Sequence, residues 1–140
     1  MLLFYEIVET TVDVDKTLTL PFDVRQKSRI KTKLDNGEEV SLLLPRGSVL
    51  RHGNILRAES GLLVKIIAAQ ESVSAVYSDD NILLMKACYH LGNRHVPVQV
   101  SNDFLRYQKD HVLDEMLIGL GLKILHEQSS FEPESGAYAH

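Results

Sequence analysis

Apolar and polar residues alternate in short runs through the first half of the chain. The runs Phe4–Glu9, Thr17–Leu20, Ile55–Ala58 and Leu62–Ala69 have the composition of β-strands, although the last also permits a short helix. Asn36-Gly37 stands between two further runs, 31–34 and 39–44. Asn-Gly at such a place is a strong hairpin signal, because both residues tolerate positive φ. These closely spaced turns predict a small β-sandwich or barrel.

Longer periods appear in the second half, where strands alternate with helices. After a strand at 72–77, a helix capped by Ser78 or Asp79 is expected to run to Leu91, with an apolar face that includes Cys88. Gly92 stands where a helix end favours a left-handed residue. The remaining expected elements are a strand at 96–100, its hairpin partner at 104–107, a helix from about 110 to 119 and a strand at 122–127. The order βαββαβ is typical of a ferredoxin-like fold.

We therefore predict an α+β protein with two domains and a tail. The domains are a β-rich sandwich or barrel at 1–71 and a ferredoxin-like domain at 72–128. Residues 129–140 contain proline, glycine, serine and glutamate without a period, which predicts a mobile tail.

The composition narrows the classes of function. A net charge of −4 argues against nucleic acid as the main partner, because phosphate binding needs a clustered basic face. No run approaches the roughly 18 apolar residues of a membrane helix, and no signal peptide is expected. The chain has one cysteine, which cannot form an internal disulfide, so we expect a cytoplasmic protein.

Histidines and surplus carboxylates gather in the second half. Residues 72–140 hold five Lys/Arg against nine Asp/Glu, and five of the six histidines, namely His90, His95, His111, His126 and His140. Imidazoles together with carboxylates attract a divalent cation, so this half points to a metal. His95 is expected at the exit of a turn between two packed elements, where it would be oriented and accessible. The spacing alone is equally compatible with a turn residue that bonds a carbonyl.

The other candidates have simpler structural interpretations. His90 is expected to support the helix surface, because positions five apart do not share a helical face with His95. His126 in an alternating strand is read as structural or solvated, and His52 as a solvated loop residue. Cys88 is read as a small buried apolar residue. For His111, at a helix start, a structural role and a ligand role are equally open.

The run His90–Pro97, with the letters HLGNRHVP, resembles the signature of the UreE-type urease accessory proteins, which are nickel metallochaperones. The resemblance continues through Leu105–Leu113, Gly119–Gly121 and Phe131–Tyr138, and Leu44–Gly47 fits it in the first half. Several ordered motifs in register make this resemblance specific, and together they cover nearly the whole chain.

The resemblance implies a β-rich domain that binds a protein partner and a ferredoxin-like domain that dimerises and binds Ni(II). It also implies delivery of nickel to urease, with an accessory GTPase and the apo-urease complex as partners. The family's principal metal ligand is the histidine that closes GNRH, here His95, which meets its symmetry mate across a homodimer. His111 matches the second residue of a His-x-His pair in some members, but Lys109 replaces the first. Many members end in a histidine-rich tail, of which this chain offers only His140, and the expected metal ligands are therefore His95, His111 and His140.

Two other classes of function remain to be compared with the nickel hypothesis. A hydrolase is disfavoured because the chain has no HExxH, no nucleophile elbow and no phosphate-binding glycine loop, and we expect no catalytic residues. A metal-independent protein-interaction module, in which the histidines are incidental, stays open as the alternative.

Overall fold

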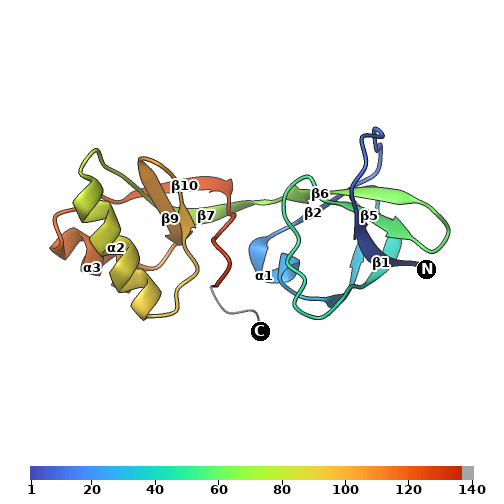
Figure 1. Cartoon of the computed structure of the whole chain (residues 1–140), viewed down its shortest axis with the longest axis horizontal. Coiled ribbons are helices and arrows are strands. Elements are labelled where there is room, and N and C mark those ends of the chain that lie inside the picture. The colour runs from blue at the N-terminus through green and yellow to red at the C-terminus, as the bar shows by residue number, and fades with distance from the viewer. Residues whose placement is uncertain (137–140) are drawn as a thin grey trace. The chain divides into compact units, whose positions relative to one another are not determined.

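The computed structural model describes residues 1–136, which form two compact units (Figure 1). The first unit spans Met1–Ala69, and the second begins at Gln70, two residues before the start of the predicted second domain at 72. Each unit has an apolar core of its own. No helix in residues 1–136 is long and apolar enough to cross a membrane.

A single sheet makes up most of the N-terminal unit. Its elements are β1 (Leu2–Val8), β2 (Thr17–Leu20), α1 (Phe22–Arg25), β3 (Arg29–Lys33), β4 (Glu39–Leu43), β5 (Ile55–Ala58) and β6 (Leu63–Ala68). The strand order is β2-β6-β5-β1-β4-β3, with β1–β4 and β2–β6 parallel and the other neighbours antiparallel. Alternate side chains such as Leu18, Val40 and Val64 are fully buried and form the core. The strand predictions are confirmed, and the run 62–69 forms a strand.

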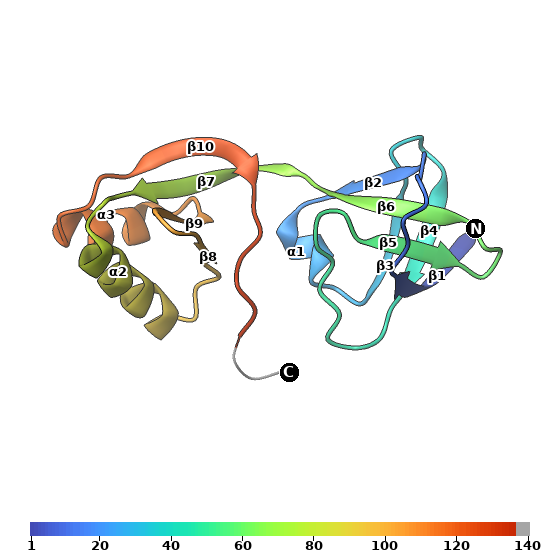
Figure 2. The same cartoon turned by 45° about the horizontal axis from the view of Figure 1, so that its top comes forward.

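The hairpin predicted around Asn36-Gly37 also joins the two edges of this sheet. Gly37 has a φ of 90°, and β3 pairs with β4 on either side of the turn. Asp35, which precedes the turn, reaches the opposite edge strand β2: the Thr17 and Thr19 hydroxyls donate to its Oδ2 at 2.7 Å. The Thr19 N–H donates to its Oδ1 at 3.0 Å. The predicted sandwich or barrel is therefore a curled, nearly closed barrel (Figure 2).

The second unit has the predicted order of elements. They are β7 (Gln70–Tyr77), α2 (Asn81–Asn93), β8 (Gln99–Val100), β9 (Phe104–Gln108), α3 (His111–Gly119) and β10 (Leu125–Ser130). The sheet order is β10-β7-β9-β8, and all neighbours are antiparallel. The two strands joined through α2 are thus separated by β9, which is the split βαβ arrangement of the ferredoxin-like fold. The predicted fold class is confirmed for both units.

Two predicted strands differ from the observed ones. The strand expected at 96–100 is reduced to Gln99–Val100, because residues 94–96 complete the end of α2 and Pro97 has no N–H to donate. The strand expected at 122–127 lies at 125–130, because Leu122 is still bonded to α3 through Leu117. The four-residue helix α1 was not predicted, since so short a segment has no period.

The prediction of a mobile tail from residue 129 is wrong for its first part. Ser129 and Ser130 continue β10 opposite Glu71 and Gln70, and Phe131 is fully buried. The Glu134 N–H donates to the Val98 carbonyl at 2.8 Å. The polar composition misled the prediction because one aromatic anchor and backbone pairing are enough to order such a segment. Residues 137–140, which include the rest of the predicted tail, lie outside the described residues.

Candidate metal centre

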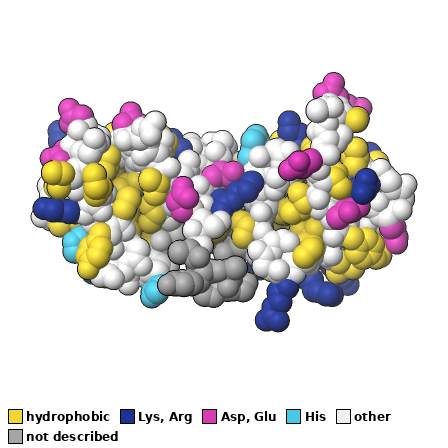
Figure 3. All heavy atoms as spheres, in the orientation of Figure 1, with side chains coloured by type: hydrophobic (Ala, Val, Ile, Leu, Met, Phe, Trp, Pro, Cys, Tyr) yellow, Lys and Arg dark blue, Asp and Glu magenta, His cyan; other side chains and the backbone are white. Residues whose placement is uncertain are grey.

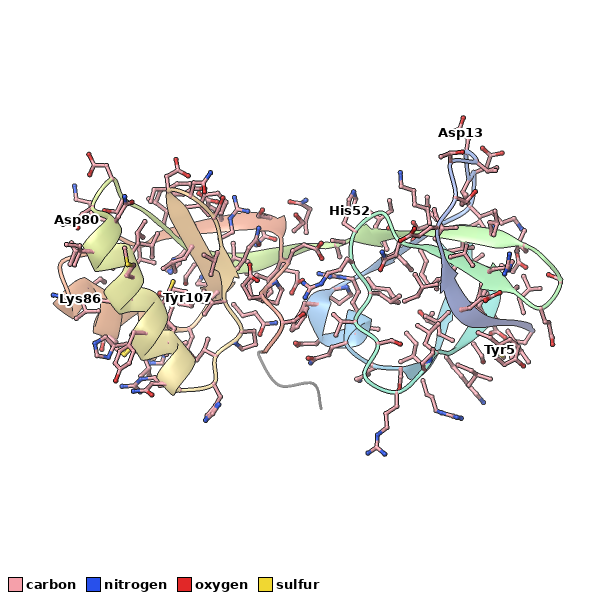
Figure 4. The ribbon with its side chains drawn as sticks, in the orientation of Figure 1. Tyr5, Asp13, His52, Asp80, Lys86 and Tyr107 are labelled. Carbon is pink, nitrogen blue, oxygen red and sulfur yellow. The ribbon has the colours of Figure 1, made fainter. Side chains whose placement is uncertain are left out.

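Helix α2 is fixed to the sheet by its apolar face and by a cap at its start. Leu84, Ala87 and Leu91 are buried in the core of the second unit, as the period predicted. The cap is Asp80 and not Ser78 or Asp79: its Oδ1 accepts the N–H groups of Ile82 and Leu83, both at 3.1 Å (Figure 4). Ser78 acts one step earlier, because its hydroxyl accepts the Asp80 N–H at 3.0 Å. A capped and buried helix holds whatever follows it in a defined place.

The end of α2 differs from the prediction at one decisive residue. Gly92 is helical, and the left-handed residue is His95, with a φ of 58°. The His95 N–H donates to the Gly92 carbonyl at 3.0 Å and the Val96 N–H to the Leu91 carbonyl at 3.2 Å. These two bonds define a Schellman motif with His95 at the position that glycine usually occupies. Val96 then packs against the apolar cluster that contains Leu91, which completes the motif.

This backbone conformation singles out His95 chemically. Among residues 1–136, His95 is the one non-glycine residue with a positive φ. Left-handed backbone costs a residue with a Cβ roughly 1–2 kcal/mol, and such strain is concentrated at functional sites. Residues 92–95 are all exposed, so the imidazole of His95 is accessible while its backbone is held by two bonds. A fixed backbone with an exposed imidazole is a suitable arrangement for a metal ligand.

His111 lies at the first position of α3 and is also exposed. Asp110 caps this helix by accepting the N–H groups of Val112 and Leu113 at 2.9 and 3.1 Å. Strands β7 and β9 are antiparallel, so they finish at opposite ends of the sheet. Helix α2 starts where β7 finishes and runs back along the sheet. It therefore finishes at the same end of the sheet as β9, which is where α3 begins. His95 and His111 therefore belong to the same end of the domain. However, residues 1–136 contain no group of three or more possible ligands that could hold a metal.

The third predicted ligand, His140, lies outside the described residues. The structure therefore does not assemble the predicted set of His95, His111 and His140. Within the described chain, the strongest candidate is a single anchored imidazole. One imidazole leaves most positions around a transition metal open, so further ligands must come from elsewhere.

The remaining histidines and the cysteine have structural surroundings. His90 packs edge-on against Tyr89, with ring centroids 5.3 Å apart. His52 is an exposed residue of a turn, as predicted, and its Nδ1 also accepts the Ala68 N–H at 3.1 Å. Burial raises the pKa of the Cys88 thiol, which disfavours the thiolate that a metal would need.

Sequence reasoning missed a buried polar group, Asp114 on α3. The Tyr107 hydroxyl donates to its Oδ1 at 2.6 Å, and His126 Nε2 lies 2.7 Å from its Oδ2. Burial alone would raise the pKa of Asp114, but the Tyr107 hydroxyl, with the nearby Ser74 and His126, lowers it on balance. Burial and the adjacent carboxylate raise the pKa of Tyr107. His126 is thus a structural residue, and its partner lies 12 residues away in the sequence.

Both folded units match domains of known proteins. Residues 6–69 match the N-terminal domain of the UreE urease accessory protein, and residues 71–140 match its C-terminal domain. The chain belongs to the UreE family. It is 54% identical over 138 residues to the urease accessory protein UreE of Alkalilimnicola ehrlichii, covering 99% of this chain and 85% of that protein. It is 55% identical over 140 residues to UreE of Citrobacter koseri, covering 99% of this chain and 92% of that one.

Membership of the UreE family settles the general role of the chain. UreE of Escherichia coli O157:H7 is a further relative, 51% identical over 140 residues, or 99% of this chain and 91% of that one. All three relatives are named as accessory proteins of urease. The chain is accordingly a urease accessory protein and not an enzyme.

Proposed function

We propose that the protein is a nickel metallochaperone that carries Ni(II) for assembly of the urease active site. In this proposal two chains form a homodimer and hold one ion between their His95 side chains. His111 and His140 supply further imidazoles. The observation that carries the proposal is the exposed His95 held in a left-handed conformation at the end of α2.

The chemistry of this residue suits a borderline cation such as Ni(II). Imidazole nitrogen is a good ligand for Ni(II), while Cu(II) and Zn(II) compete for the same donor. A twofold axis needs only one ligand per chain, because the same residue is supplied again by the second copy. The resulting shell is incomplete and exchangeable, which allows the ion to be passed on. A closed cage of protein ligands would retain the ion more firmly.

The outer face of α2 supports association with a second copy. Ile82, Met85 and Tyr89 recur at i, i+3 and i+7 and are 64%, 65% and 66% exposed. They lie on the side of the helix opposite to the buried Leu84, Ala87 and Leu91. We refer to these three exposed residues as the α2 stripe. Figure 3 shows apolar side chains on the surface of the second unit, to which α2 belongs. Contiguous exposed apolar residues mark interaction sites, and the stripe is on the helix that carries His95 at its end.

The partners follow from the same proposal. Nickel held by the dimer would be transferred to the urease maturation machinery, for which the resemblance implies an accessory GTPase and the apo-urease complex. Because the only cysteine is unpaired, a reducing cytoplasm is the compartment that we propose.

A nickel titration followed by native mass spectrometry tests the proposal. We expect about one tightly bound Ni(II) per dimer, since the shared site uses one His95 from each chain. The variant His95→Gln should lose this ion and remain folded. His90→Gln is the matched control, because His90 lies near the end of the same helix and is half-buried.

Retention of the ion by His95→Gln would refute the role of His95. The metal-independent interaction module makes a different prediction. In that case His95→Gln would mature urease as well as the unchanged protein in a reconstituted assay with limiting nickel.

A further inference from the structure

A surface hollow of about 640 Å³ lies in the N-terminal unit, and none of its lining residues is a candidate metal ligand. Its polar and aromatic lining comprises Tyr5, Ser28, Arg29 and Arg46, with Pro45 and the end of β4 beside them. Tyr5, Arg29, Pro45 and Arg46 are exposed, so the hollow is open to a macromolecular partner.

Local backbone structure brings the two arginines together. Arg29 begins β3 and pairs with Leu43 at the end of β4, and the Leu44 N–H donates to the Ser28 carbonyl at 2.8 Å. Arg46 follows in a turn closed by the Ser48 N–H, which donates to the Pro45 carbonyl at 3.1 Å. Gly47 has a φ of 86°, as the third position of a type II turn requires. The turn therefore holds Arg46 at the rim beside Arg29.

Tyr5 enters the hollow because strand β1 is irregular at this residue. The pairing of β1 with β5 shifts between Phe4 and Glu6, which makes Tyr5 the extra residue of a β-bulge. Bulges redirect side chains and occur preferentially next to functional sites. Phe4 is fully buried in the core, whereas Tyr5 is 41% exposed and projects from β1 (Figure 4).

The charges of the hollow are unbalanced. Within residues 1–136, the side chains of Arg29 and Arg46 make no hydrogen bond and no ion pair. No carboxylate lines the hollow. Glu6, which follows Tyr5 in the sequence, is already bound by Arg57, whose Nε donates to the Glu6 carboxylate at 2.7 Å. Arginine forks bind carboxylates bidentately, and tyrosine and arginine are among the side chains most enriched at the centres of interfaces.

We propose that this hollow binds an acidic segment of a partner protein. Carboxylates of the segment would be bound by Arg29 and Arg46, while Tyr5 and Pro45 pack against its backbone and apolar stems. A nucleic acid is disfavoured because residues 1–71 hold ten basic and ten acidic residues, so this half of the chain has no net positive charge to attract a long polyanion. The inference goes beyond the nickel-carrying role and does not depend on it.

Fluorescence anisotropy with a fluorescein-labelled peptide of alternating glutamate and glycine tests the inference on the full chain. The double variant Arg29→Gln/Arg46→Gln should bind the peptide about tenfold more weakly, because two charge-assisted contacts are lost. Lys31→Gln/Lys33→Gln is the matched control: it removes the same charge from exposed residues of β3 that do not line the hollow. This control should bind within about twofold of the unchanged chain, since neither lysine lines the hollow and each acts on the peptide only through solvent.

Tyr5→Ala provides a second variant that leaves the charge unchanged, and it should also weaken binding of the peptide. Equal weakening by both double variants, or no binding of the peptide by the unchanged chain, would overturn the inference. Binding of oligothymidylate as tightly as the peptide would overturn the choice of an acidic polypeptide. Thermal melting confirms that each variant is folded. A nickel titration of Arg29→Gln/Arg46→Gln should match the unchanged chain, which keeps this test separate from that of His95.

Discussion

His95 occupies in α2 the position that Gly121 occupies in α3. Each residue donates its N–H to a carbonyl three residues earlier, at 3.0 Å to Gly92 and 2.9 Å to Ile118. In each case the next residue bonds five residues back, at 3.2 Å, and the φ values are 58° and 99°. The same helix end is therefore built once with glycine and once with histidine. The domain tolerates strain at His95 that it avoids at Gly121, and we attribute that difference to function.

This equivalence predicts that His95→Gly stabilises the fold while removing the metal ligand. Relief of left-handed strain stabilises the folded state by roughly 1–2 kcal/mol. The extra freedom of glycine in the unfolded chain destabilises the folded state by roughly 0.4–1 kcal/mol. We expect the free energy of unfolding to rise by about 0.5–1 kcal/mol in a urea titration. The reciprocal variant Gly121→Ala should lower it by a similar amount, because a Cβ there meets no atom within 4 Å and only the backbone is strained.

Gly92 gives a second prediction, in which alanine changes the stability in the opposite direction from alanine at Gly121. It lies inside α2 with helical backbone, and a Cβ at this position meets no atom within 4 Å. Gly92→Ala should therefore raise the free energy of unfolding by about 0.5–1 kcal/mol, as alanine does in exposed helices. A urea titration at neutral pH measures the change. A decrease in stability would show that residue 92 needs a conformation that alanine cannot adopt.

The sequence predicted α2 well but not its end. An apolar period locates a helix because it reports which face is buried, and Leu84, Ala87 and Leu91 were found in this way. The end of α2 is determined by a tertiary contact, because Val96 packs against the same apolar cluster as Leu91. A glycine near the end of the period was therefore mistaken for the left-handed residue. Likewise, His52 and His126 bond to Ala68 and Asp114, and no local pattern reports such contacts.

The site itself could be predicted only in part for a related reason. A motif identifies His95 as a candidate, but most of the complementary ligands of the proposed site would come from a second chain and from the region beyond residue 136. Neither the periodicity of one chain nor its internal contacts contain that information.

The contacts of Asp35 predict how the barrel responds to pH. Asp35→Ala removes the acceptor for Thr17 and Thr19 and should lower the free energy of unfolding by about 1 kcal/mol. Burial acts to raise the pKa of Asp35, but the hydrogen bonds from Thr17 and Thr19 outweigh it, and the pKa is lowered. The stabilisation is thus complete above the ordinary aspartate pKa of about 3.9 and is lost as the pH falls through the lower folded value.

Urea titrations of Asp35→Ala and the unchanged chain, at neutral pH and at about pH 2.5, measure this dependence. The difference between the two proteins should shrink at the lower pH. Asp13→Ala serves as the control, because Asp13 is exposed in the loop that precedes β2. Its free energy of unfolding should match that of the unchanged chain at both pH values. A difference that is constant with pH would contradict the role of the ionised carboxylate.

Tyr107 and Asp114 predict a larger loss in the second unit. Tyr107→Phe removes the hydroxyl that donates to a buried carboxylate, and a hydrogen bond to a charged group is worth roughly 1.5–3 kcal/mol. We expect the free energy of unfolding to fall by about 2 kcal/mol. Tyr77→Phe is a matched control, because its hydroxyl donates to Glu127 at an exposed position. Equal losses of stability in the two variants would show that the buried hydrogen bond from Tyr107 to Asp114 contributes no more than an exposed one.

The α2 stripe makes the last prediction, which links assembly to nickel. Met85 is 65% exposed, so Met85→Glu should fold normally while placing a charge in the proposed interface between copies. Sedimentation should then show a shift from dimer to monomer, and nickel bound per chain should fall, because a monomer offers only one His95. Val12→Glu is the control, since Val12 is 63% exposed on a loop of the N-terminal unit. A monomeric Met85→Glu protein that still binds nickel as tightly as the unchanged chain would mean that His95 is not shared across a twofold axis.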